Sequence, residues 1–243
     1  MKTVLVTGAS GDIGGAIAAA FAENNFNVVI NYNTNEKRAK QLEESLSEAG
    51  AAVMSVKADV TVKEQVEAMF AKVQKRFGDV DVLVNNAGAS MIKMLCDTSE
   101  QDWQNMLGSN LKSAYLCINS ASGGMVRNKY GRIINISSIW GLRGASCEAA
   151  YSAAKAGLVG LTKAMAKELS LSGITVNCVC PGFIDTKMNS HLSESEKSEV
   201  LSEIPMERIG LCSDVANAVM FFADEKSTYV TGQILGVDGG WSL

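Results

Sequence analysis

Short apolar segments and helical patterns alternate along the whole chain of 243 residues, and this alternation constrains the fold more than any other feature. Helices between buried strands let consecutive strands run parallel. The predicted strands are residues 4–7, 28–32, 52–59, 81–86, 133–136, 174–180 and 232–238. The predicted helices are residues 13–24, 35–49, 61–76, a long one from 99, another from 151, and 213–223. The sequence therefore predicts one α/β domain over residues 1–243, with a Rossmann-type doubly wound, mostly parallel sheet of about seven strands flanked by helices.

A glycine-rich turn, TGASGDIGG at residues 7–15, follows the first strand. Glycines here let the backbone approach a pyrophosphate, and the N-terminus of the next helix supplies amide donors and a favourable dipole. A glycine cluster alone suits any tight turn, but its place between the first strand and a helix favours dinucleotide binding. The predicted contacts are Gly8, Ser10, Gly11, Asp12, Ile13 and Gly14.

The end of the second strand bears on cofactor choice. An acidic residue there would bind the 2′-hydroxyl of NAD, but Tyr32 stands at that position. Polar and basic residues around it can contact a 2′-phosphate instead: Asn31, Asn33 and Thr34, with Lys37 and Arg38 nearby. The sequence therefore favours NADP(H), with NAD(H) as the alternative.

Polar residues also follow the third strand. Asp59, next to Val60, can accept a hydrogen bond from an adenine amine, and both residues are predicted to contact the cofactor. Asp59 can alternatively cap the next helix with Thr61, which the spacing to Glu64 places in a capping box.

The fourth and sixth strands end at the same carboxyl edge, where open parallel sheets bind ligands. The residues that follow them are predicted to line a cofactor cleft, although a plain turn would explain the first group. They are Asn86, Ala87 and Gly88 after the fourth strand, and Pro181, Gly182, Ile184 and Thr186 after the sixth.

Three side chains around the fifth strand suggest proton transfer. Ser138 emerges where this strand ends, and Tyr151 and Lys155 are four apart on one face of the following helix. A free phenol has a pKa of about 10, and a nearby ammonium lowers that value. Ser138 can hold a substrate oxygen while Tyr151 exchanges its proton, which is the proton half of carbonyl reduction or alcohol oxidation. A chance pair on a solvated helix face is the alternative.

Two features near this group remain open. Asn110 lies within a predicted helix despite its poor helix propensity, and it can hold a water beside Lys155 or simply face solvent. Residues 188–205 are polar and rich in serine, which predicts a substrate lid or a pair of solvated helices.

The bulk composition excludes several functions. A net charge of −4 leaves no basic surface for nucleic acid or an anionic membrane. The start of the chain shows no signal peptide and no apolar run is long enough to span a bilayer, so the sequence predicts a cytoplasmic protein. The six scattered cysteines are predicted to be small buried hydrophobes, and no metal site is predicted. The single histidine, His191, lies in a polar stretch, which argues against a hydrolase.

Together these motifs resemble the classical short-chain dehydrogenase/reductase family over essentially the whole chain. The resemblance rests on the glycine-rich turn, residues 85–88, the residues Asn110, Ser138, Tyr151 and Lys155, Pro181-Gly182, and residues 237–240. It implies a Rossmann fold, a homotetramer, and Tyr151 as general acid/base. It further implies that Lys155 binds the nicotinamide ribose and that Ile184 and Thr186 meet the carboxamide.

Within that family the chain is most similar to the 3-oxoacyl-[acyl-carrier-protein] reductases, through NISS, YSAAKAGLVGLTKAMAKEL and VNCVCPGFIDTKM. Residues 139–148 are instead similar to those of the elongation factor P 5-aminopentanone reductases. That resemblance implies a ketone on a modified lysine, whose cationic amine Glu148 can receive. The predicted substrate contacts are Ser138, Trp140, Glu148 and Met188. Acyl carrier protein and elongation factor P are thus the alternative partners.

One position departs from the family pattern, because Asp12 stands where glycine is usual. A carboxylate near a pyrophosphate is repulsive, unless it turns away as a helix N-cap. The leading prediction is an NADPH-dependent carbonyl reductase. A non-catalytic nucleotide sensor is the alternative from another class, and it would need none of the four catalytic side chains.

Overall fold

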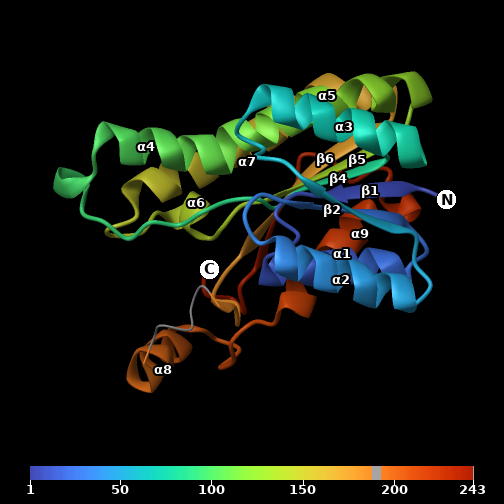
Figure 1. Ribbon diagram of the computed structural model, residues 1–243. Helices are drawn as coiled ribbons and strands as arrows, with labels where there is room; N and C mark the ends of the chain where they lie inside the picture. Colours follow the sequence, from blue (N-terminus) through green and yellow to red (C-terminus); the bar gives the residue numbers. More distant parts are fainter. Residues whose placement is uncertain (188–192, 243) are drawn as a thin grey trace.

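The computed structural model describes residues 1–187 and 193–242 and contains one seven-stranded sheet (Figure 1). The strand order is β3-β2-β1-β4-β5-β6-β7, and every strand pair is parallel. The strands are β1 (Thr3–Val6), β2 (Asn27–Tyr32), β3 (Val53–Lys57), β4 (Val82–Asn85), β5 (Gly131–Ile136), β6 (Ile174–Pro181) and β7 (Ile234–Val237). The predicted doubly wound Rossmann-type fold is confirmed.

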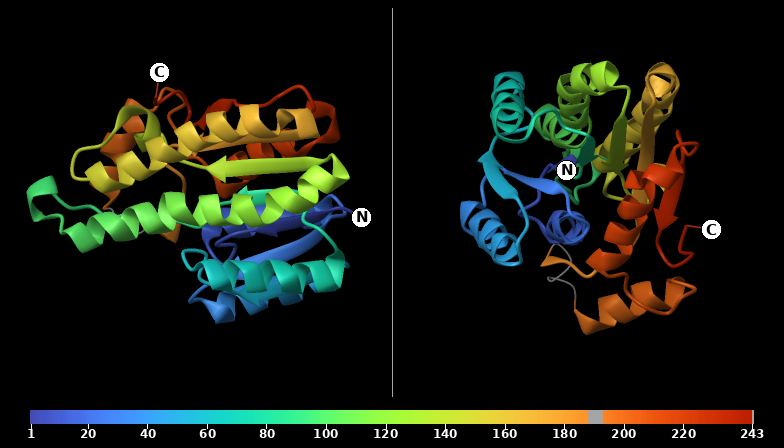
Figure 2. Two further views of the ribbon diagram at one scale, coloured as in Figure 1. Left: turned by 90° about the horizontal axis from the view of Figure 1, so that it is seen from above. Right: turned by 90° about the vertical axis from the view of Figure 1, so that its right-hand side faces the viewer.

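Helices cover both faces of this sheet, as the view along the strands in Figure 2 shows. One layer holds α1 (Asp12–Glu23), α2 (Glu36–Glu48) and α9 (Cys212–Ala223). The other holds α3 (Lys63–Phe77), α5 (Ser113–Asn128) and α7 (Ala149–Leu169). The period-2 alternation of the strands separates the two cores: Val4 and Val6 pack into the first layer, whereas Leu5 packs into the second.

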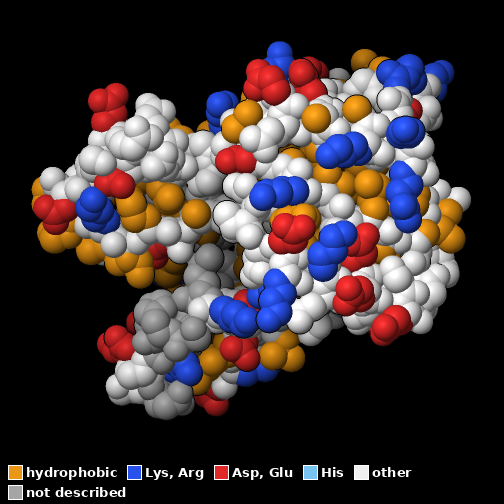
Figure 3. Space-filling view, viewed as in Figure 1, with side chains coloured by type: hydrophobic (Ala, Val, Ile, Leu, Met, Phe, Trp, Pro, Cys, Tyr) orange, Lys and Arg blue, Asp and Glu red, His pale blue; other side chains and the backbone are white. Residues whose placement is uncertain are grey.

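Additional elements extend past the carboxyl ends of the strands. They are α4 (Glu100–Leu107), the π-helical turn η2 (Gly108–Lys112), α6 (Trp140–Arg143) and α8 (Glu194–Glu203). Figure 3 shows that the surface is hollowed between the α4 end of the molecule and α8. Three short 3₁₀ turns complete the described chain: η1 (Leu95–Asp97), η3 (Ser170–Ser172) and η5 (Glu225–Ser227).

The predicted capping box at residues 61–64 is wrong. Helix α3 begins at Lys63, and its N-cap Val62 has no side chain able to cap. Thr61 is engaged elsewhere, because its Oγ1 donates to Asp59 Oδ1 at 2.7 Å. A capping box forms instead at the start of α4, between Ser99 and Asp102.

The prediction of uniformly buried cysteines is only partly correct. Cys117, Cys178 and Cys180 are buried, but Cys96 is exposed, and Cys147 and Cys212 are half-exposed on loop and helix surfaces. His191 lies outside the described residues, as do the first residues of the segment predicted as a lid, whereas α8 forms its later part. No helix in the described part of the chain is long and apolar enough to cross a membrane.

Candidate active site

A cleft of about 700 Å³ opens where β1, β4, β5 and β6 end. This volume is typical of a small-molecule or cofactor site. The glycine-rich turn forms one end of its lining, and the Ser138–Tyr151–Lys155 group forms part of the rest. The carboxyl edge of the sheet therefore brings the two predicted functional regions into one cavity.

The hydroxyls of Ser138 and Tyr151 meet in this cleft. Ser138 follows β5 and is 8% exposed, and Tyr151 is the third residue of α7. The contact of Ser138 with the Tyr151 hydroxyl favours the charged form of the tyrosine. The backbone N–H of Trp140 donates to Ser138 Oγ at 3.2 Å and helps to hold the serine in place.

Lys155 lies one helical turn beyond Tyr151 and is 4% exposed. Its Nζ donates to the carbonyl of Ile136 at 2.9 Å and lies 5.6 Å from the centroid of the Tyr151 ring. Ser137 Oγ donates to the Lys155 carbonyl at 2.9 Å and joins the end of β5 to α7. The ammonium is thus held against the strand end, facing the tyrosine ring.

The predicted lowering of the tyrosine pKa is wrong in this geometry. Burial raises the pKa of Tyr151 to about 12, although the hydrogen bond with Ser138 opposes the rise. Burial also lowers the pKa of Lys155 to about 8. Desolvation of the charged form therefore dominates both pKa shifts. Tyr151 is a neutral phenol at physiological pH, which is the form that can donate a proton.

Asn110 lies in η2, between α4 and α5. Its Nδ2 donates to Ala89 O at 2.8 Å and to Met106 O at 3.0 Å, while its buried Oδ1 has no partner among the described residues. A Cβ added to Gly88 would lie 2.5 Å from that oxygen and 3.4 Å from Lys155 Nζ. Asn110 therefore faces Lys155 and leaves one acceptor for a ligand or a water, instead of pointing to solvent.

The glycine-rich turn is locked against the end of β4. Asn86 Nδ2 donates to Thr7 O at 2.9 Å, and a Cβ on Gly14 would lie 2.6 Å from that nitrogen. Gly8 adopts φ +63°, and a Cβ there would lie 2.9 Å from Ala87 Cα. No side chain fits at either glycine, so neither position carries a side chain that could cover the backbone at the start of α1, which faces the cleft. This arrangement fits the pyrophosphate of a dinucleotide.

Asp12, the first residue of α1, does not act as the predicted alternative N-cap. Gly11 is the N-cap residue and has no side chain to contribute. The Asp12 carboxylate instead pairs with Arg38 of α2 and accepts from Lys187 N at 2.8 Å. Burial would raise the pKa of Asp12, but these contacts lower it below its ordinary value. The carboxylate is therefore charged and paired at the rim of the cleft.

Comparison with known proteins identifies the family. A family model described as enoyl-(acyl carrier protein) reductase matches residues 8–242. The 3-oxoacyl-[acyl-carrier-protein] reductase FabG of Staphylococcus aureus is 43% identical over 239 residues, which cover 98% of this chain and 97% of the relative. The chain belongs to the short-chain dehydrogenase/reductase family. It is therefore an NAD(P)-dependent oxidoreductase acting on CH–OH or C=O groups, which disfavours the non-catalytic sensor.

Other members of the short-chain dehydrogenase/reductase family match with similar coverage. FabG of Chlamydia muridarum is 41% identical, with 98% of this chain and 96% of the relative covered. The uncharacterized oxidoreductase YmfI of Bacillus subtilis is 39% identical, with 99% and 98% covered. The solved structure of a candidate gluconate dehydrogenase from Agrobacterium tumefaciens aligns with a TM-score of 0.96 at 34% identity, covering 99% of this chain and 96% of that one.

Most predicted cofactor residues of this short-chain dehydrogenase/reductase line the cleft. They are Gly8, Ser10, Gly11, Asp12, Ile13, Gly14, Asn86, Ala87, Gly88, Tyr151, Lys155, Pro181, Gly182, Ile184 and Thr186. The predicted catalytic residues Asn110, Ser138, Tyr151 and Lys155 are all in that lining too. The structure therefore brings together residues that lie as far apart in the sequence as Gly8 and Thr186.

Three residues of the predicted cofactor set have side chains that are buried away from the cleft, and their contact with a cofactor stays a prediction. Asn31 is 1% exposed; it accepts from Gly8 N at 3.2 Å and donates to Ala58 O at 3.0 Å. It therefore shapes the turn without facing a phosphate. Tyr32 and Val60 are 5% and 7% exposed and pack into the two cores.

Three further predicted contacts lie outside the lining of the described cleft. Asn33 and Thr34 are exposed beyond the end of β2. Asp59 accepts from both the backbone and the hydroxyl of Thr61, which matches its alternative role as a local cap. Their contact with a cofactor stays a prediction.

The substrate side of the cleft is aromatic and acidic. Trp140 and Trp241 meet edge to face, with ring centroids 5.1 Å apart, and both line the cavity. Glu148 is half-buried beside Tyr151, and burial raises its pKa. Its carboxylate forms no hydrogen bond or ion pair with any side chain in the described part of the chain. The fourth predicted substrate contact, Met188, lies outside the described residues.

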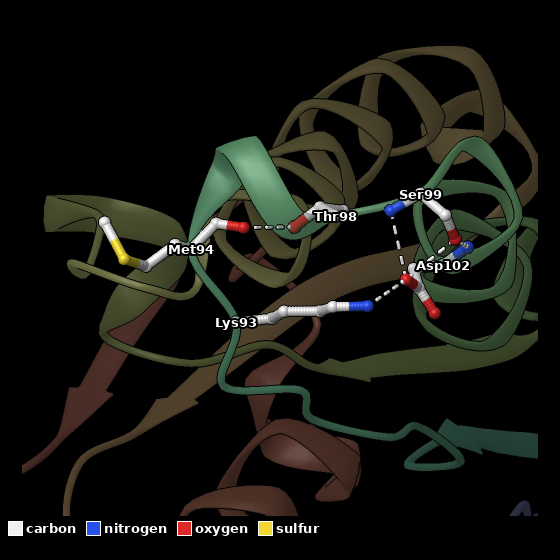
Figure 4. A network of polar contacts seen from close by, with 5 residues as sticks. All are labelled: Lys93, Met94, Thr98, Ser99 and Asp102. Atoms are coloured by element: carbon white, nitrogen blue, oxygen red, sulfur yellow. Dashed lines mark hydrogen bonds and ion pairs between the residues drawn. The ribbon is translucent and has the colours of Figure 1, made fainter.

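The segment after β4 completes the cleft wall through Ile92 and is held by a polar network (Figure 4). Lys93 Nζ pairs with Asp102 Oδ2 at 2.7 Å, and Ser99 Oγ donates to the same oxygen at 2.7 Å. The contact with Lys93 helps to lower the pKa of Asp102 to about 2. Lys93 N also donates to Cys147 O, which ties this wall to the loop before Glu148.

Sequence reasoning missed several lining residues. Trp241 follows the closing glycine motif, and only the fold brings it to Trp140. Ile92 lies in an irregular segment with no periodicity to interpret. Asn35 is the N-cap residue of α2, after β2, and a helix start near a sheet switch point is a signal that could have identified it.

Proposed function

We propose that this chain reduces the ketone of a 3-oxoacyl group carried on acyl carrier protein, with NADPH as the hydride donor and Tyr151 as the proton donor. The observation that carries the proposal is the hydroxyl pair of Ser138 and Tyr151, set beside Lys155 in the cleft that the glycine-rich turn closes. The names of the relatives from Staphylococcus and Chlamydia support the carrier-bound substrate.

Each side chain has a defined task in this reaction. Ser138 Oγ donates a hydrogen bond to the carbonyl oxygen, and Tyr151 gives that oxygen its phenolic proton as the alcohol forms. Lys155 stabilises the phenolate left behind and holds the ribose. Bound NADPH supplies the hydride to the carbonyl carbon. Asn110 Oδ1, the free buried acceptor, orients a water that returns a proton toward Lys155.

The test is oxidation of NADPH, with NADH in parallel, in the presence of acetoacetyl-acyl carrier protein. We expect turnover with NADPH. Turnover with neither dinucleotide, in a protein that binds NADPH, would show that the substrate assignment is wrong. A preference for NADH would show that the cofactor assignment is wrong.

A second candidate substrate is favoured by Glu148. A half-buried carboxylate without a partner is costly unless a ligand compensates it, and here it stands beside the proton donor and an aromatic wall. A cationic substrate would pair with it, and a tryptophan face also attracts a cation. An amino ketone on a modified lysine of elongation factor P has this charge, whereas an acyl chain does not.

Replacing Glu148 separates the two candidates. If the substrate is an amino ketone, we expect Glu148→Gln to lower kcat/KM for a small amino ketone by ~10-fold or more, because a charge-assisted contact is worth about 1.5–3 kcal/mol. Turnover of a neutral 3-oxoacyl substrate should change little. Unchanged selectivity for the amino ketone would exclude this role for Glu148.

Glu100→Gln provides the matched control. Glu100 is an exposed residue of the first turn of α4 and lies outside the cleft lining. The same change of charge there should leave both substrates unaffected. Equal losses in the two variants would point to net charge instead of a contact in the cleft.

A further inference from the structure

The rim of the cleft at the glycine-rich turn carries a charge arrangement that the proposed reaction does not use. Arg38 lies in the first turn of α2, directly beyond the end of β2, and lines the cleft. Lys37 next to it is exposed and outside the lining. A basic residue placed after the second strand is positioned to meet the 2′-phosphate that distinguishes NADPH from NADH.

This guanidinium already has a partner. Asp12 Oδ1 accepts from one Arg38 nitrogen, and Asp12 Oδ2 accepts from Lys187 N at 2.8 Å. The side chains are only 34% and 20% exposed, so solvent screens the pair incompletely. The other guanidinium nitrogens of Arg38 form no hydrogen bond with the residues that the structure describes.

A phosphate that approaches Arg38 must therefore share it with a carboxylate. The remaining guanidinium donors can bind the phosphate, but Asp12 cancels part of the positive charge that attracts it to Arg38. NADH has a hydroxyl at this place, and its binding depends less on that charge. We infer that Asp12 competes with the 2′-phosphate for Arg38 and so sets how strongly this chain discriminates NADPH from NADH.

The inference rests on the proposed use of NADPH, and equilibrium binding tests it without any carbonyl substrate. Isothermal titration calorimetry gives Kd for NADPH and NADH with wild type, Asp12→Asn, Arg38→Gln and the double variant. We expect Asp12→Asn to raise the ratio of Kd for NADH to Kd for NADPH by about fivefold, the scale of a partly exposed ion pair. Arg38→Gln should lower that ratio.

The double variant isolates the coupling between the two residues. With glutamine at position 38 there is no guanidinium to compete for, so adding Asp12→Asn should leave the Kd ratio unchanged. If Asp12→Asn raises the Kd ratio equally with arginine and with glutamine at position 38, the inference is wrong, because Asp12 would then act on the phosphates directly. A fall in the Asp12→Asn ratio would also overturn it, since Asp12 would then orient Arg38 for the phosphate.

Asp214→Asn is the matched control. Asp214 pairs with Arg208 at 2.8 Å and accepts from Leu211 N at 2.8 Å, which repeats the contacts of Asp12 away from the cofactor cleft. Its Kd ratio should equal that of wild type, and a thermal melt of every variant verifies folding. If wild type binds neither dinucleotide, the proposed function is wrong. If wild type binds NADPH and Asp12→Asn has the same Kd ratio as wild type, only this inference is wrong.

Discussion

A buried cation lies beside a tyrosine at each end of β5, but the two pairs differ in function. At the amino end, the buried guanidinium of Arg132 stacks on the Tyr130 ring at 4.6 Å. At the carboxyl end, the buried ammonium of Lys155 faces the Tyr151 ring at 5.6 Å. A buried cation beside a tyrosine is therefore not sufficient to make a reaction centre.

The difference lies in access to a ligand. Tyr151 lines a cleft together with Ser138. Tyr130 is covered by Lys2, whose Nζ lies 3.6 Å from the ring centroid, and the hydroxyl of Tyr130 is buried. A buried lysine amine can also lose its proton, whereas a guanidinium acts as a fixed charge. Chemistry requires the open edge of the sheet as well as the side chains.

Removing the two tyrosine hydroxyls should give the largest contrast. We expect Tyr151→Phe to lower kcat for ketone reduction by ~10²–10⁴-fold, the usual contribution of a positioned general acid. Tyr130→Phe should leave kcat unchanged. Steady-state oxidation of NADPH measures both, and a comparable loss in Tyr130→Phe would mean that the two ends are not functionally distinct.

The pH dependence of ketone reduction should be set by Lys155, at the carboxyl end of β5, and not by Arg132 at the amino end. Because the pKa of Lys155 is about 8, its ammonium loses its proton above that pH and no longer stabilises the phenolate. We expect kcat/KM for reduction to fall above about pH 8, while Tyr151 keeps its proton up to about pH 12. A profile that stays flat to pH 10 would contradict the role of Lys155.

The same titration affects stability with the opposite sign. The pKa of Lys155 is lower in the folded chain than its ordinary value of 10.5, so the unfolded chain binds more protons between about pH 8 and 10.5. This group therefore makes the free energy of unfolding rise with pH across that window. Urea titrations should show the rise disappear in Lys155→Met and persist in Arg132→Met.

Replacing a glycine by alanine near each end of β5 should give the smallest difference between the two ends. A Cβ on Gly141 would lie 2.8 Å from the backbone carbon of Lys155, which cannot move alone. A Cβ on Gly131, at the amino end, would meet only the side chain of Met125, which is flexible. We expect Gly141→Ala to cost about 1–3 kcal/mol in the free energy of unfolding, and Gly131→Ala to cost less. Urea denaturation measures the difference, and equal costs would contradict it.

Local patterns predicted much of this molecule. The alternation of strands and helices gave the sheet, and motif spacing identified Ser138, Tyr151 and Lys155 in the cleft. The inward orientation of the Asn31 side chain was not predicted, because the sequence does not say which face of a strand end a polar side chain takes. The raised pKa of Tyr151 was missed because desolvation depends on packing from distant segments. Trp241 reaches the cleft through tertiary contacts that no local pattern encodes.

The wide turn η2 between α4 and α5 has a consequence for how this chain tolerates insertions and deletions. Removing one residue from Gly108–Lys112 would let a regular α-helix run through, with better local hydrogen bonding. Each residue of such a helix advances it by about 100°, so α4 and its Ser99–Asp102 capping box would swing around the axis relative to α5. A deletion within η2 would therefore move Asn110 out of the cleft, so the number of residues in this turn is fixed by the site.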